Sequence, residues 1–556
     1  MNKKVCSFPI LFALLALLIG TCAVVFPASA QAAPTSTGSI TVSGTVASSY
    51  DAYQIFSANV VDGDSDAKIA TDLAWASDAV RDAALPVLHS AGMPKSQTTA
   101  QEAAEWLNAD SHLTSALSAQ LARSLQSSGA VFVALNAGTT AELSCGYWLI
   151  VADDGAIAQG EAGTAPIMAL VGGSAVTVKP KAATPKVSKH VLEDSTAAWQ
   201  KAADATVADD LYWRLSATVP AGLTAYDTYT VQFVDTMSAG LDPSKVAASM
   251  RVYVAAGADG GFDAVQTGKD GRAGTEPAKG WTDITAQCAT KVAADGKTFT
   301  VRTGDLIAAL GGADAFTAGA RVVAVYNAPL NSACNHGIAK GNPNEVYLRY
   351  PRSPFADQTG VAGFTRTPSD DACAYTWDLA LTKRGSDGDK PLSGAVLSIA
   401  DDRGRTLAAD GTWDAEGKAT VTTGEDGRVT VSGVDSGKLE VRELKAPKGY
   451  VAFEGTRSVT VKAEGLDVDQ VAAAKPKLTI TAESPLRADS ADGSTGSLEA
   501  SLINTPTGTP PSITTGGFMP STGDMAMYAA AAAAVAGAAL IVVALLVKRG
   551  GGSHKE

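Results

Sequence analysis

The sequence predicts a mainly β protein, with helices inserted into its first domain. Glycine is abundant, at 54 of 556 residues, and short apolar or β-branched runs are bounded by Gly, Asp, Asn or Pro, which is typical of strands and turns. The clearest runs are residues 39–46, 229–234, 251–255, 321–326 and 429–431. The chain is long enough for three domains, each with a core of its own.

Helical spacing is concentrated between residues 67 and 128. Three Ala-, Leu- and Gln-rich segments, 72–88, 99–108 and 113–125, have Ser, Thr or Asp near their starts. Such residues cap helix N-termini. We therefore expect three helices among the strands of the first domain.

The N-terminus has the pattern of a cleaved secretory signal. Lys3 and Lys4 precede the apolar run 8–25, and small residues follow at which cleavage after Ala30 or Ala32 fits. Residues 1–30 are therefore predicted to be a signal peptide, and the mature protein is expected to be exported.

Near the C-terminus, Met519-Pro520-Ser521-Thr522-Gly523 precedes an apolar run at 525–547 and a basic tail at 548–556. About 20 apolar residues cross a bilayer, and cations after them stay in the cytoplasm, so we expect a transmembrane helix at 525–547. The pentapeptide resembles the LPxTG sorting signal of Gram-positive surface proteins, with Met519 in the Leu position. That resemblance implies a sortase, which cuts between Thr522 and Gly523 and passes the Thr522 acyl group to an amine. The alternative is an ordinary single-span anchor.

Several classes of function are disfavoured. The net charge of −13 leaves no basic patch for nucleic acid. The five histidines and the cysteines lack metal-ligand spacing, and neither GxSxG nor HExxH occurs, so we expect no metal, no cofactor and no enzymatic activity. The mature chain keeps four cysteines, whose three alternative disulfide pairings stay open: Cys145, Cys288, Cys334 and Cys373.

The segment 439–450, LEVRELKAPKGY, carries the clearest internal chemistry. It resembles the E-box of Gram-positive pilins, with Leu444 where the family usually has Thr. On a strand, Leu439, Val441 and Glu443 share one face, so we expect Glu443 to point into the core. A buried carboxyl group without a partner tends to stay protonated.

Two further residues of the same domain are expected to point inward. Lys383 lies on the apolar face of the segment 379–383, and Asn504 lies on that of 498–504. The set resembles CnaB-type domains, which implies an Ig-like β-sandwich. It also implies an isopeptide bond, in which Lys383 attacks the Asn504 side-chain amide, ammonia leaves, and Glu443 relays protons. Burial would keep the lysine neutral and hold the reactants together. The alternative is a Lys383–Glu443 ion pair, with Asn504 capping the strand.

The middle domain offers a second set. Lys189 lies on its first strand, Asp235 shares a face with apolar neighbours, and Asn331 follows a late strand. This set resembles the CnaA-like middle domain of backbone pilins, which implies a Lys189–Asn331 isopeptide bond with Asp235 as the proton relay. The family pattern Tyr-x-Ala-x-Leu-Asn falls on 326–331 and favours Asn331, with Asn327 as the alternative.

The first domain resembles the N-terminal domain of the same pilins, and its exit, residues 176–181, resembles their V-Y-P-K motif with Lys179 in the Tyr position. By position, Lys181 is the implied amine that attacks Thr522 of another subunit. The alternative is an ordinary solvated linker lysine. Composition and resemblance together give this division: signal peptide 1–30, N-terminal domain 31–181, CnaA-like domain 182–368, CnaB-like domain 369–505, Pro/Thr/Gly linker 506–518, sorting motif 519–523, transmembrane helix 525–547 and cytoplasmic tail 548–556.

As a whole the chain resembles a major (backbone) pilin of Gram-positive bacteria. The resemblance implies a structural subunit that is secreted, anchored to the cell wall and polymerised into a surface pilus that supports adhesion and colonisation. The implied partners are pilus-specific and housekeeping sortases, further copies of the chain, minor tip and base pilins, peptidoglycan and host surface ligands. The alternative is a monomeric wall-anchored adhesin that uses the same domains as a stalk.

Overall fold

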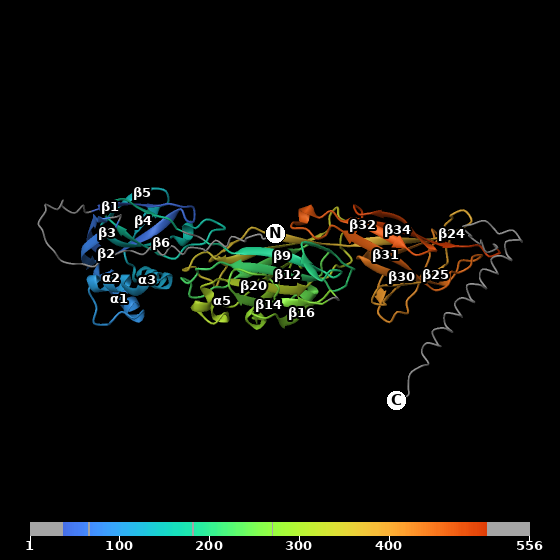
Figure 1. Cartoon of the computed structure of the whole chain (residues 1–556), viewed down its shortest axis with the longest axis horizontal. Coiled ribbons are helices and arrows are strands. Elements are labelled where there is room, and N and C mark those ends of the chain that lie inside the picture. Colours follow the sequence, from blue (N-terminus) through green and yellow to red (C-terminus); the bar gives the residue numbers. More distant parts are fainter. Residues whose placement is uncertain (1–36, 65–66, 181–182, 269–270, 509–556) are drawn as a thin grey trace, which may run out of the picture.

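The computed structural model describes residues 37–64, 67–180, 183–268 and 271–508. These residues form three lobes in a row, in chain order: the first lobe (37–178), the middle lobe (186–375) and the third lobe (377–504) (Figure 1). Each lobe has its own sheets and its own buried apolar core. The predicted mainly β class, with helices confined largely to the first lobe, is confirmed.

The first lobe has a three-stranded sheet, a five-stranded sheet and a layer of helices. Strands β2 and β6 pack Tyr50 and Trp148 against the small sheet and Phe56 and Leu149 against the helices, so the larger sheet is buried on both faces. The elements are β1 (Thr37–Val42), β2 (Ser49–Asp62), β3 (Lys68–Trp75), α1 (Asp78–Ser90), α2 (Ala100–Asn108), η2 (Ala109–Ser111), α3 (Ser115–Ser128), β4 (Val133–Asn136), β5 (Thr140–Ser144), β6 (Gly146–Ala152), η3 (Asp154–Ala156), β7 (Ile167–Val171) and β8 (Val176–Val178).

The three expected helices are present, and side chains cap their first turns. Ser77, Thr99 and Thr114 each accept a hydrogen bond from a backbone N–H of the following turn. The prediction that the first helix begins at residue 72 is wrong. Residues 72–75 complete β3, which pairs with β2, and the helix begins only after the Ser77 cap.

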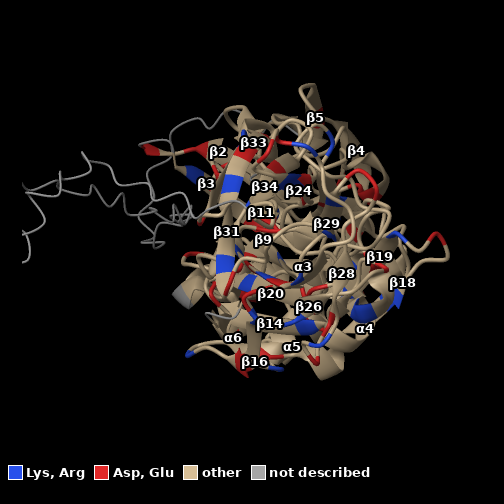
Figure 2. Ribbon diagram, turned by 90° about the vertical axis from the view of Figure 1, so that its right-hand side faces the viewer, with Lys and Arg blue, Asp and Glu red and all other residues tan. Residues whose placement is uncertain are grey.

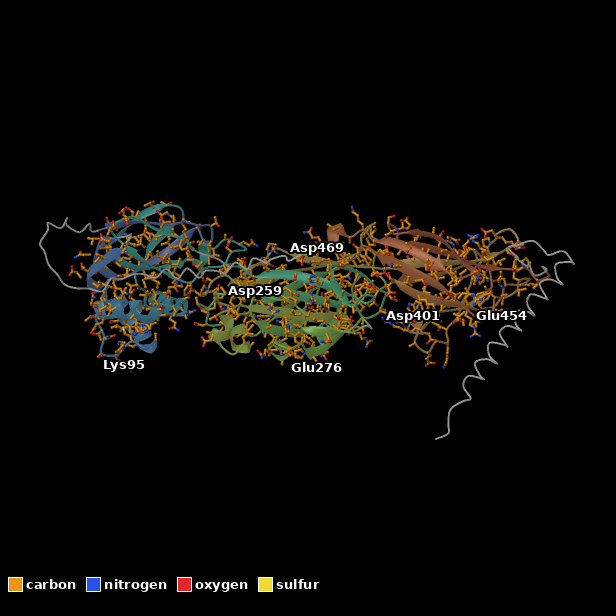
Figure 3. All side chains as sticks on the ribbon, in the orientation of Figure 1. Lys95, Asp259, Glu276, Asp401, Glu454 and Asp469 are labelled. Atoms are coloured by element: carbon orange, nitrogen blue, oxygen red, sulfur yellow. The ribbon has the colours of Figure 1, made fainter. Side chains whose placement is uncertain are left out.

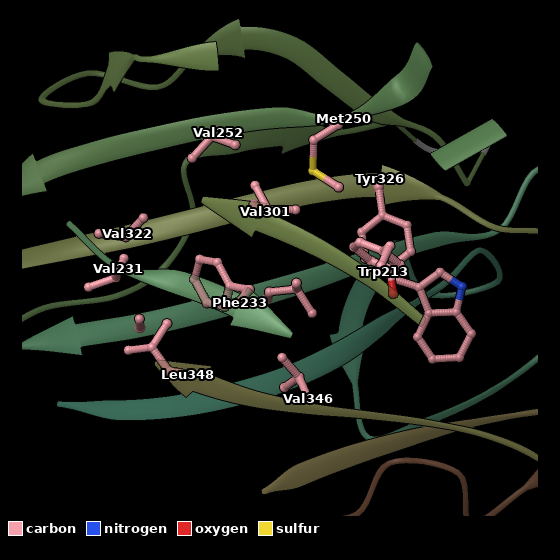
Figure 4. Close-up of a cluster of buried hydrophobic side chains, with 14 of the residues drawn as sticks. Trp213, Val231, Phe233, Met250, Val252, Val301, Val322, Tyr326, Val346 and Leu348 are labelled. Carbon is pink, nitrogen blue, oxygen red and sulfur yellow. The ribbon is translucent and has the colours of Figure 1, made fainter. Parts of the chain in front are cut away.

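The middle lobe has two large sheets packed face to face around the largest core, and a separate two-stranded sheet of β15 and β16. The six-stranded sheet has the order β10-β9-β12-β20-β14-β17, and the other has β11-β23-β21-β13-β19-β18 with β22 beside β21. Trp213, Val322 and Tyr326 from the first sheet meet Phe233 and Leu348 from the second, as Figure 4 shows.

The elements of the middle lobe are β9 (Lys186–Glu193), β10 (Ala198–Gln200), β11 (Ala202–Asp204), β12 (Tyr212–Val219), β13 (Gln232–Met237), η4 (Pro243–Lys245), α4 (Val246–Ser249), β14 (Arg251–Ala256), β15 (Val265–Thr267), β16 (Ala273–Pro277), β17 (Thr282–Asp283), η5 (Thr285–Gln287), β18 (Ala289–Val292), β19 (Thr298–Arg302), α5 (Leu306–Ala309), α6 (Ala313–Phe316), β20 (Ala320–Asn327), β21 (Asn342–Pro351), β22 (Phe364–Arg366) and β23 (Asp370–Tyr375). Strand β23 lies after the expected domain boundary at residue 368, yet it pairs with β11 and β21 of the middle lobe.

The third lobe is also a two-sheet sandwich. Its first and last strands, β24 and β34, are parallel neighbours in the four-stranded sheet β29-β24-β34-β33, and β30 lies in the facing sheet β27-β26-β25-β30-β31-β32, where β28 pairs β25. The elements are β24 (Trp377–Gly385), β25 (Val396–Ala400), β26 (Thr406–Leu407), β27 (Trp413–Asp414), β28 (Val421–Thr422), β29 (Arg428–Val434), β30 (Gly437–Lys445), β31 (Thr456–Glu464), η6 (Val471–Ala473), β32 (Lys477–Ala482), β33 (Leu486–Asp492) and β34 (Ser497–Asn504).

Polar contacts join the lobes. The Arg123 guanidinium of the first lobe lies 2.9 Å from the Asp227 carboxylate of the middle lobe. On the other side, the Trp377 indole of the third lobe donates to the buried Asp204 at 2.7 Å. Acidic and basic residues are interspersed over the ribbon in Figure 2. In Figure 3, Lys95 and Glu276 are labelled at the lower margin of the molecule and Asp469 at its upper margin.

Several sequence predictions fall outside the described residues: the signal peptide, most of the Pro/Thr/Gly linker, the sorting motif, the transmembrane helix at 525–547 and the cytoplasmic tail. Within the described part, no helix is long and apolar enough to cross a membrane. Among the described cysteines, Cys288, Cys334 and Cys373 form no disulfide, and burial raises the pKa of each thiol to about 11.

Candidate functional site

The first candidate site lies inside the third lobe, where Lys383, Asn504 and Glu443 meet. In the parallel pair β24–β34, Lys383 is opposite Leu502, so Asn504 is the next inward-facing residue beyond it. Strand β30 brings Glu443 from the facing sheet. The side chains of Lys383 and Glu443 are fully buried, and Asn504 is 2% exposed.

All three side chains are in direct contact. The Lys383 Nζ atom donates to Asn504 Oδ1 and lies 2.9 Å from Glu443 Oε1. The Asn504 amide nitrogen donates to both Glu443 oxygens, at 2.9 and 3.0 Å. The carboxyl group also accepts from the Phe453 backbone at 3.1 Å. Glu443 therefore touches both the amine and the amide.

Burial lowers the pKa of Lys383 to about 8, against the opposing effect of Glu443. At pH 7 roughly one lysine in ten is then neutral and nucleophilic. The site therefore holds a neutral amine in contact with an amide, and a carboxyl group hydrogen-bonded to the amide nitrogen that would leave. These are the groups that amide exchange requires.

The second candidate site lies in the core of the middle lobe. Lys189 on β9 and Asp235 on β13 are fully buried and form an ion pair. The Tyr326 hydroxyl on β20 lies 2.9 Å from Lys189 Nζ and donates to Asp235 at 3.1 Å. The same hydroxyl accepts from the amide of Asn344 on β21 at 2.8 Å. Four strands thus converge on one phenolic oxygen.

Burial perturbs the charged groups of this second site in opposite directions. It lowers the pKa of Lys189 to about 8 and raises that of Asp235 above the ordinary range, although each partially stabilises the other's charge. Both shifts favour the neutral forms. The Asp235 Oδ1 and Asn344 Oδ1 atoms are buried without a hydrogen-bond partner in the described part of the chain.

The structure corrects the expected asparagine of the middle lobe. The Asn331 side chain is partly exposed and donates to the Ala239 carbonyl at 2.9 Å, outside the core. Asn327 is buried, but its amide bonds Asp210 at 2.6 Å and its oxygen accepts from Leu211. Neither asparagine contacts Lys189, so the amide that the fold brings to this site is Asn344.

Sequence reasoning missed Asn344 and Tyr326, although period-two alternation could have found the first. In β21, Asn344, Val346 and Leu348 alternate with more exposed residues and are all fully buried. No comparable signal singles out Tyr326, because an aromatic residue on a core strand is ordinary.

The predicted linkage residues Lys181, Thr522 and Gly523 lie outside the described residues. Lys181 follows Pro180, at the exit of the first lobe, and Lys186 begins β9 on the other side.

A known protein family matches part of the third lobe. Residues 378–475 match the SpaA family, described as a prealbumin-like fold domain. This segment contains Lys383 and Glu443, and the last strand with Asn504 lies beyond it.

One curated relative is the trypsin-resistant surface T6 protein of Streptococcus pyogenes serotype M6. It is 28% identical over 143 residues, which are 24% of this chain and 24% of the T6 protein, so the chain matches about a quarter of that relative's length. The predicted resemblance to Gram-positive pilins is confirmed by this match together with the SpaA-family segment.

Two solved structures are similar along most of the chain. The T6 backbone pilin of S. pyogenes is 17% identical, with a TM-score of 0.45, and the match covers 86% of this chain and 100% of that one. The major pilin SpaA of Corynebacterium diphtheriae is 13% identical, with a TM-score of 0.36, and covers 85% and 100%. Both TM-scores lie below 0.5.

Proposed function

We propose that this protein is the major structural subunit of a covalently polymerised surface pilus. The observation that supports it most strongly is the buried contact of Lys383, Glu443 and Asn504 between the first and last strands of the third lobe. A bond at this position would carry tension from one strand directly to the other. Such a device suits a shaft protein, which is pulled along its length.

The chemistry of the proposed bond balances without a cofactor. The neutral Lys383 amine attacks the Asn504 side-chain carbonyl carbon, the C–N bond to the amide nitrogen breaks, and ammonia leaves. Glu443 hydrogen-bonds the amide nitrogen and transfers the amine proton to it. The bond forms within the chain, so the protein acts on itself once and is not an enzyme.

The middle lobe supports a second bond of the same kind, from Lys189 to Asn344 with Asp235 as the proton relay. The assignment rests on the shared contact with Tyr326 and on the neutral forms that burial favours. Tyr326 holds the amine and the amide on either side of its hydroxyl.

Polymerisation is proposed to join subunits end to end. A pilus-specific sortase would cleave between Thr522 and Gly523 and transfer the Thr522 acyl group to Lys181 of the next subunit, and a housekeeping sortase would attach the finished polymer to peptidoglycan. The three lobes in a row, with Lys181 after the first lobe and Thr522 after the third, suit a filament of this kind (Figure 1). Minor pilins and host surface ligands are further proposed partners.

An immunoblot of wall extracts boiled in SDS tests this function. A polymer gives a ladder of high-mass species, and Lys181→Ala should abolish the ladder while a folded monomer remains. Lys186→Ala, an exposed lysine beside the same linker, is the matched control and should leave the ladder intact. A single wall-linked species from the unmodified chain would instead indicate a monomeric stalk adhesin. A ladder that persists in Lys181→Ala would contradict the choice of lysine.

A further inference from the structure

A row of arginines crosses the solvent-facing side of the second middle-lobe sheet. Arg302 on β19 and Arg349 on β21 are both directly opposite Gln232 on β13, and Arg366 on β22 is directly opposite Arg349. Directly opposite residues project from the same face of a sheet. Like charges in that position destabilise strand pairing, so the directly opposite pair Arg349 and Arg366 has a cost that a bound anion would lower.

Part of this row lines a pocket at the seam between the first and middle lobes. The pocket has a volume of 280 Å³, and Arg349, Arg352 and Arg366 of the middle lobe contribute its positive charge. Ile157 and Gln159 of the first lobe also line it. The pocket therefore exists only because the two lobes are docked.

Hydrogen bonds across the seam fix the two walls. The Gly160 backbone N–H of the first lobe donates to Thr365 Oγ1 at 2.8 Å, and the Tyr350 hydroxyl donates to the Gly160 carbonyl at 2.7 Å. The Gly163 N–H donates to the Arg352 carbonyl at 2.6 Å. The pocket is consequently preformed, which lowers the entropic cost of binding.

The guanidinium groups of the pocket arginines, Arg349, Arg352 and Arg366, are not neutralised by acidic partners. Their hydrogen bonds go to neutral oxygens: Arg349 donates to Gln232 at 3.1 Å and to the Tyr347 hydroxyl at 3.2 Å, and Arg352 donates to the Asp154 and Phe364 carbonyls. In the described part of the chain, the hydrogen bonds of Arg349 and Arg352 reach no carboxylate oxygen. The Nε atom of Arg352 is buried without a partner.

The acidic side chain of Asp154 interacts electrostatically with one arginine of the pocket, Arg352. Burial raises the pKa of Asp154, however, and its Oδ1 atom has no hydrogen-bond partner among the described residues. It can offset the charge of one arginine at most. Arg349 and Arg366 both stack over the Tyr347 ring, at 5.6 and 5.0 Å, so their positions are fixed without an acid.

We propose that this pocket binds an acidic sugar through its carboxylate or sulfate group. Guanidinium forks match the geometry of such oxyanions and bind them with paired hydrogen bonds. A volume of 280 Å³ is at the lower end for a small-molecule site and suits one sugar ring. The half-buried Ile157 side chain offers apolar surface for the ring, and the exposed Gln159 amide offers hydrogen bonds to its hydroxyl groups.

Calorimetric titration of the full-length chain, in a detergent without a sugar headgroup, tests the proposal. The ligands are D-glucuronate, D-glucose 6-sulfate and D-glucose, which share a ring and differ in the oxyanion, and inorganic sulfate is titrated alone. For a ligand of this size we expect a dissociation constant on the order of 1 mM for an acidic sugar. Glucose should show no saturable binding at about ten times that concentration.

Variants locate the site. Arg349→Gln and Arg366→Gln should each weaken binding by about tenfold or more, because each removes one charged fork. Arg442→Gln, an exposed arginine on β30 of the third lobe, changes the net charge equally and should leave the affinity unchanged. If Arg349→Gln fails to fold, the exposed Arg366→Gln and the three-ligand comparison on the unmodified chain still decide the question.

Four outcomes would overturn the proposal: no binding of either acidic sugar, equal binding of glucose, equal weakening by Arg442→Gln, or binding of inorganic sulfate without either sugar. The last would mean an adventitious ion only. Binding of one acid but not the other supports the site and identifies the oxyanion. Because the monomer binds or fails to bind regardless of polymerisation, this test and the ladder test can fail independently.

Discussion

The two candidate crosslinks differ in what lies between amine and amide. In the third lobe, Lys383 contacts Asn504 directly, and Glu443 touches both. In the middle lobe, the Tyr326 hydroxyl bonds Lys189 on one side and Asn344 on the other, and Asp235 reaches the amine but bonds no atom of the amide. Both lysines are fully buried, so the difference lies in geometry and not in solvent access.

That difference has a kinetic consequence. Bond formation needs the amine nitrogen at the amide carbon in a near-attack position, and misplacement of about 1 Å costs roughly a hundredfold in rate. In the third lobe, Lys383 Nζ already contacts the Asn504 side-chain amide, through its oxygen. In the middle lobe the Tyr326 hydroxyl must first move aside, so we expect the third-lobe bond to form before the middle-lobe bond.

The largest expected effect follows from removing the proton relay of the third lobe. Glu443→Ala keeps both reactants but cannot transfer the proton, so the chain should fold and retain the mass of one ammonia. The lost crosslink spans 121 residues, and its absence should lower the free energy of unfolding by about 5 kcal/mol by loop-entropy reasoning. Intact mass and thermal unfolding measure the two effects.

Glu440→Ala is the matched control, since Glu440 lies on the same strand but points to solvent, where it pairs with Lys438. It should lose the ammonia normally. A normal mass deficit in Glu443→Ala would contradict the assigned role of Glu443 and remove the distinction between the two sites.

A smaller loss is expected from the middle lobe, where the slower bond leaves some molecules unlinked. Asn344→Ala should prevent the bond to Lys189 and lower stability by at most about 5 kcal/mol. Asn331→Ala, which changes a partly exposed asparagine at the edge of the same lobe, should leave the bond intact. Peptide mapping by mass spectrometry that joins Lys189 to Asn331 would reverse this expectation.

The sequence predicted the third-lobe site more completely than the middle-lobe site, for a physical reason. Lys383, Glu443 and Asn504 each lie on a regular strand, where alternation alone decides which side chains face the core. Asn331 lies in the turn after β20, where no alternation applies and backbone direction changes within a few residues. The middle lobe also depends on the pairing of β13 with β21, which joins residues far apart in sequence and cannot be obtained from local pattern.

One domain limit and one helix start differ from their predicted positions. Strand β23 resembles the start of a new domain in composition, but its register with β21 assigns it to the middle lobe. The helical pattern was correct in kind, while β3 occupies the first residues of the predicted first helix because they complete the hairpin with β2. In both cases the pairing of a strand with its neighbours overrides a local preference.

A third prediction concerns only the rate at which the middle-lobe bond forms. Tyr326→Phe keeps the buried ring and removes the hydroxyl between Lys189 and Asn344, so the middle-lobe bond should form faster and approach the third-lobe bond in timing. Time-resolved intact mass after synthesis should show two separated losses of ammonia in the unmodified chain and nearly simultaneous losses in the variant. Tyr226→Phe removes another buried hydroxyl of the same lobe, one without a partner among the described residues, and should change nothing. A middle-lobe bond that fails to form in Tyr326→Phe would show that the hydroxyl takes part in proton transfer.

The smallest expected effect is a pH dependence that both sites should share. In Asn504→Ala the amine of Lys383 stays free, with a pKa of about 8 in the folded chain, against the ordinary lysine value of about 10.4 in the unfolded chain. Between these values the unfolded state binds more protons, so the free energy of unfolding of the variant rises with pH. The unmodified chain has an amide at this position and lacks the effect, so the stability gap between the two should narrow by roughly 1 kcal/mol from pH 8 to pH 9. Asn344→Ala should behave alike, because burial lowers the pKa of Lys189 to about 8 as well.

Denaturant unfolding at pH 7, 8, 9 and 10 measures the difference in free energy of unfolding between the unmodified chain and each variant. If this difference stays constant with pH in only one variant, the lysine of that site remains charged before the bond forms.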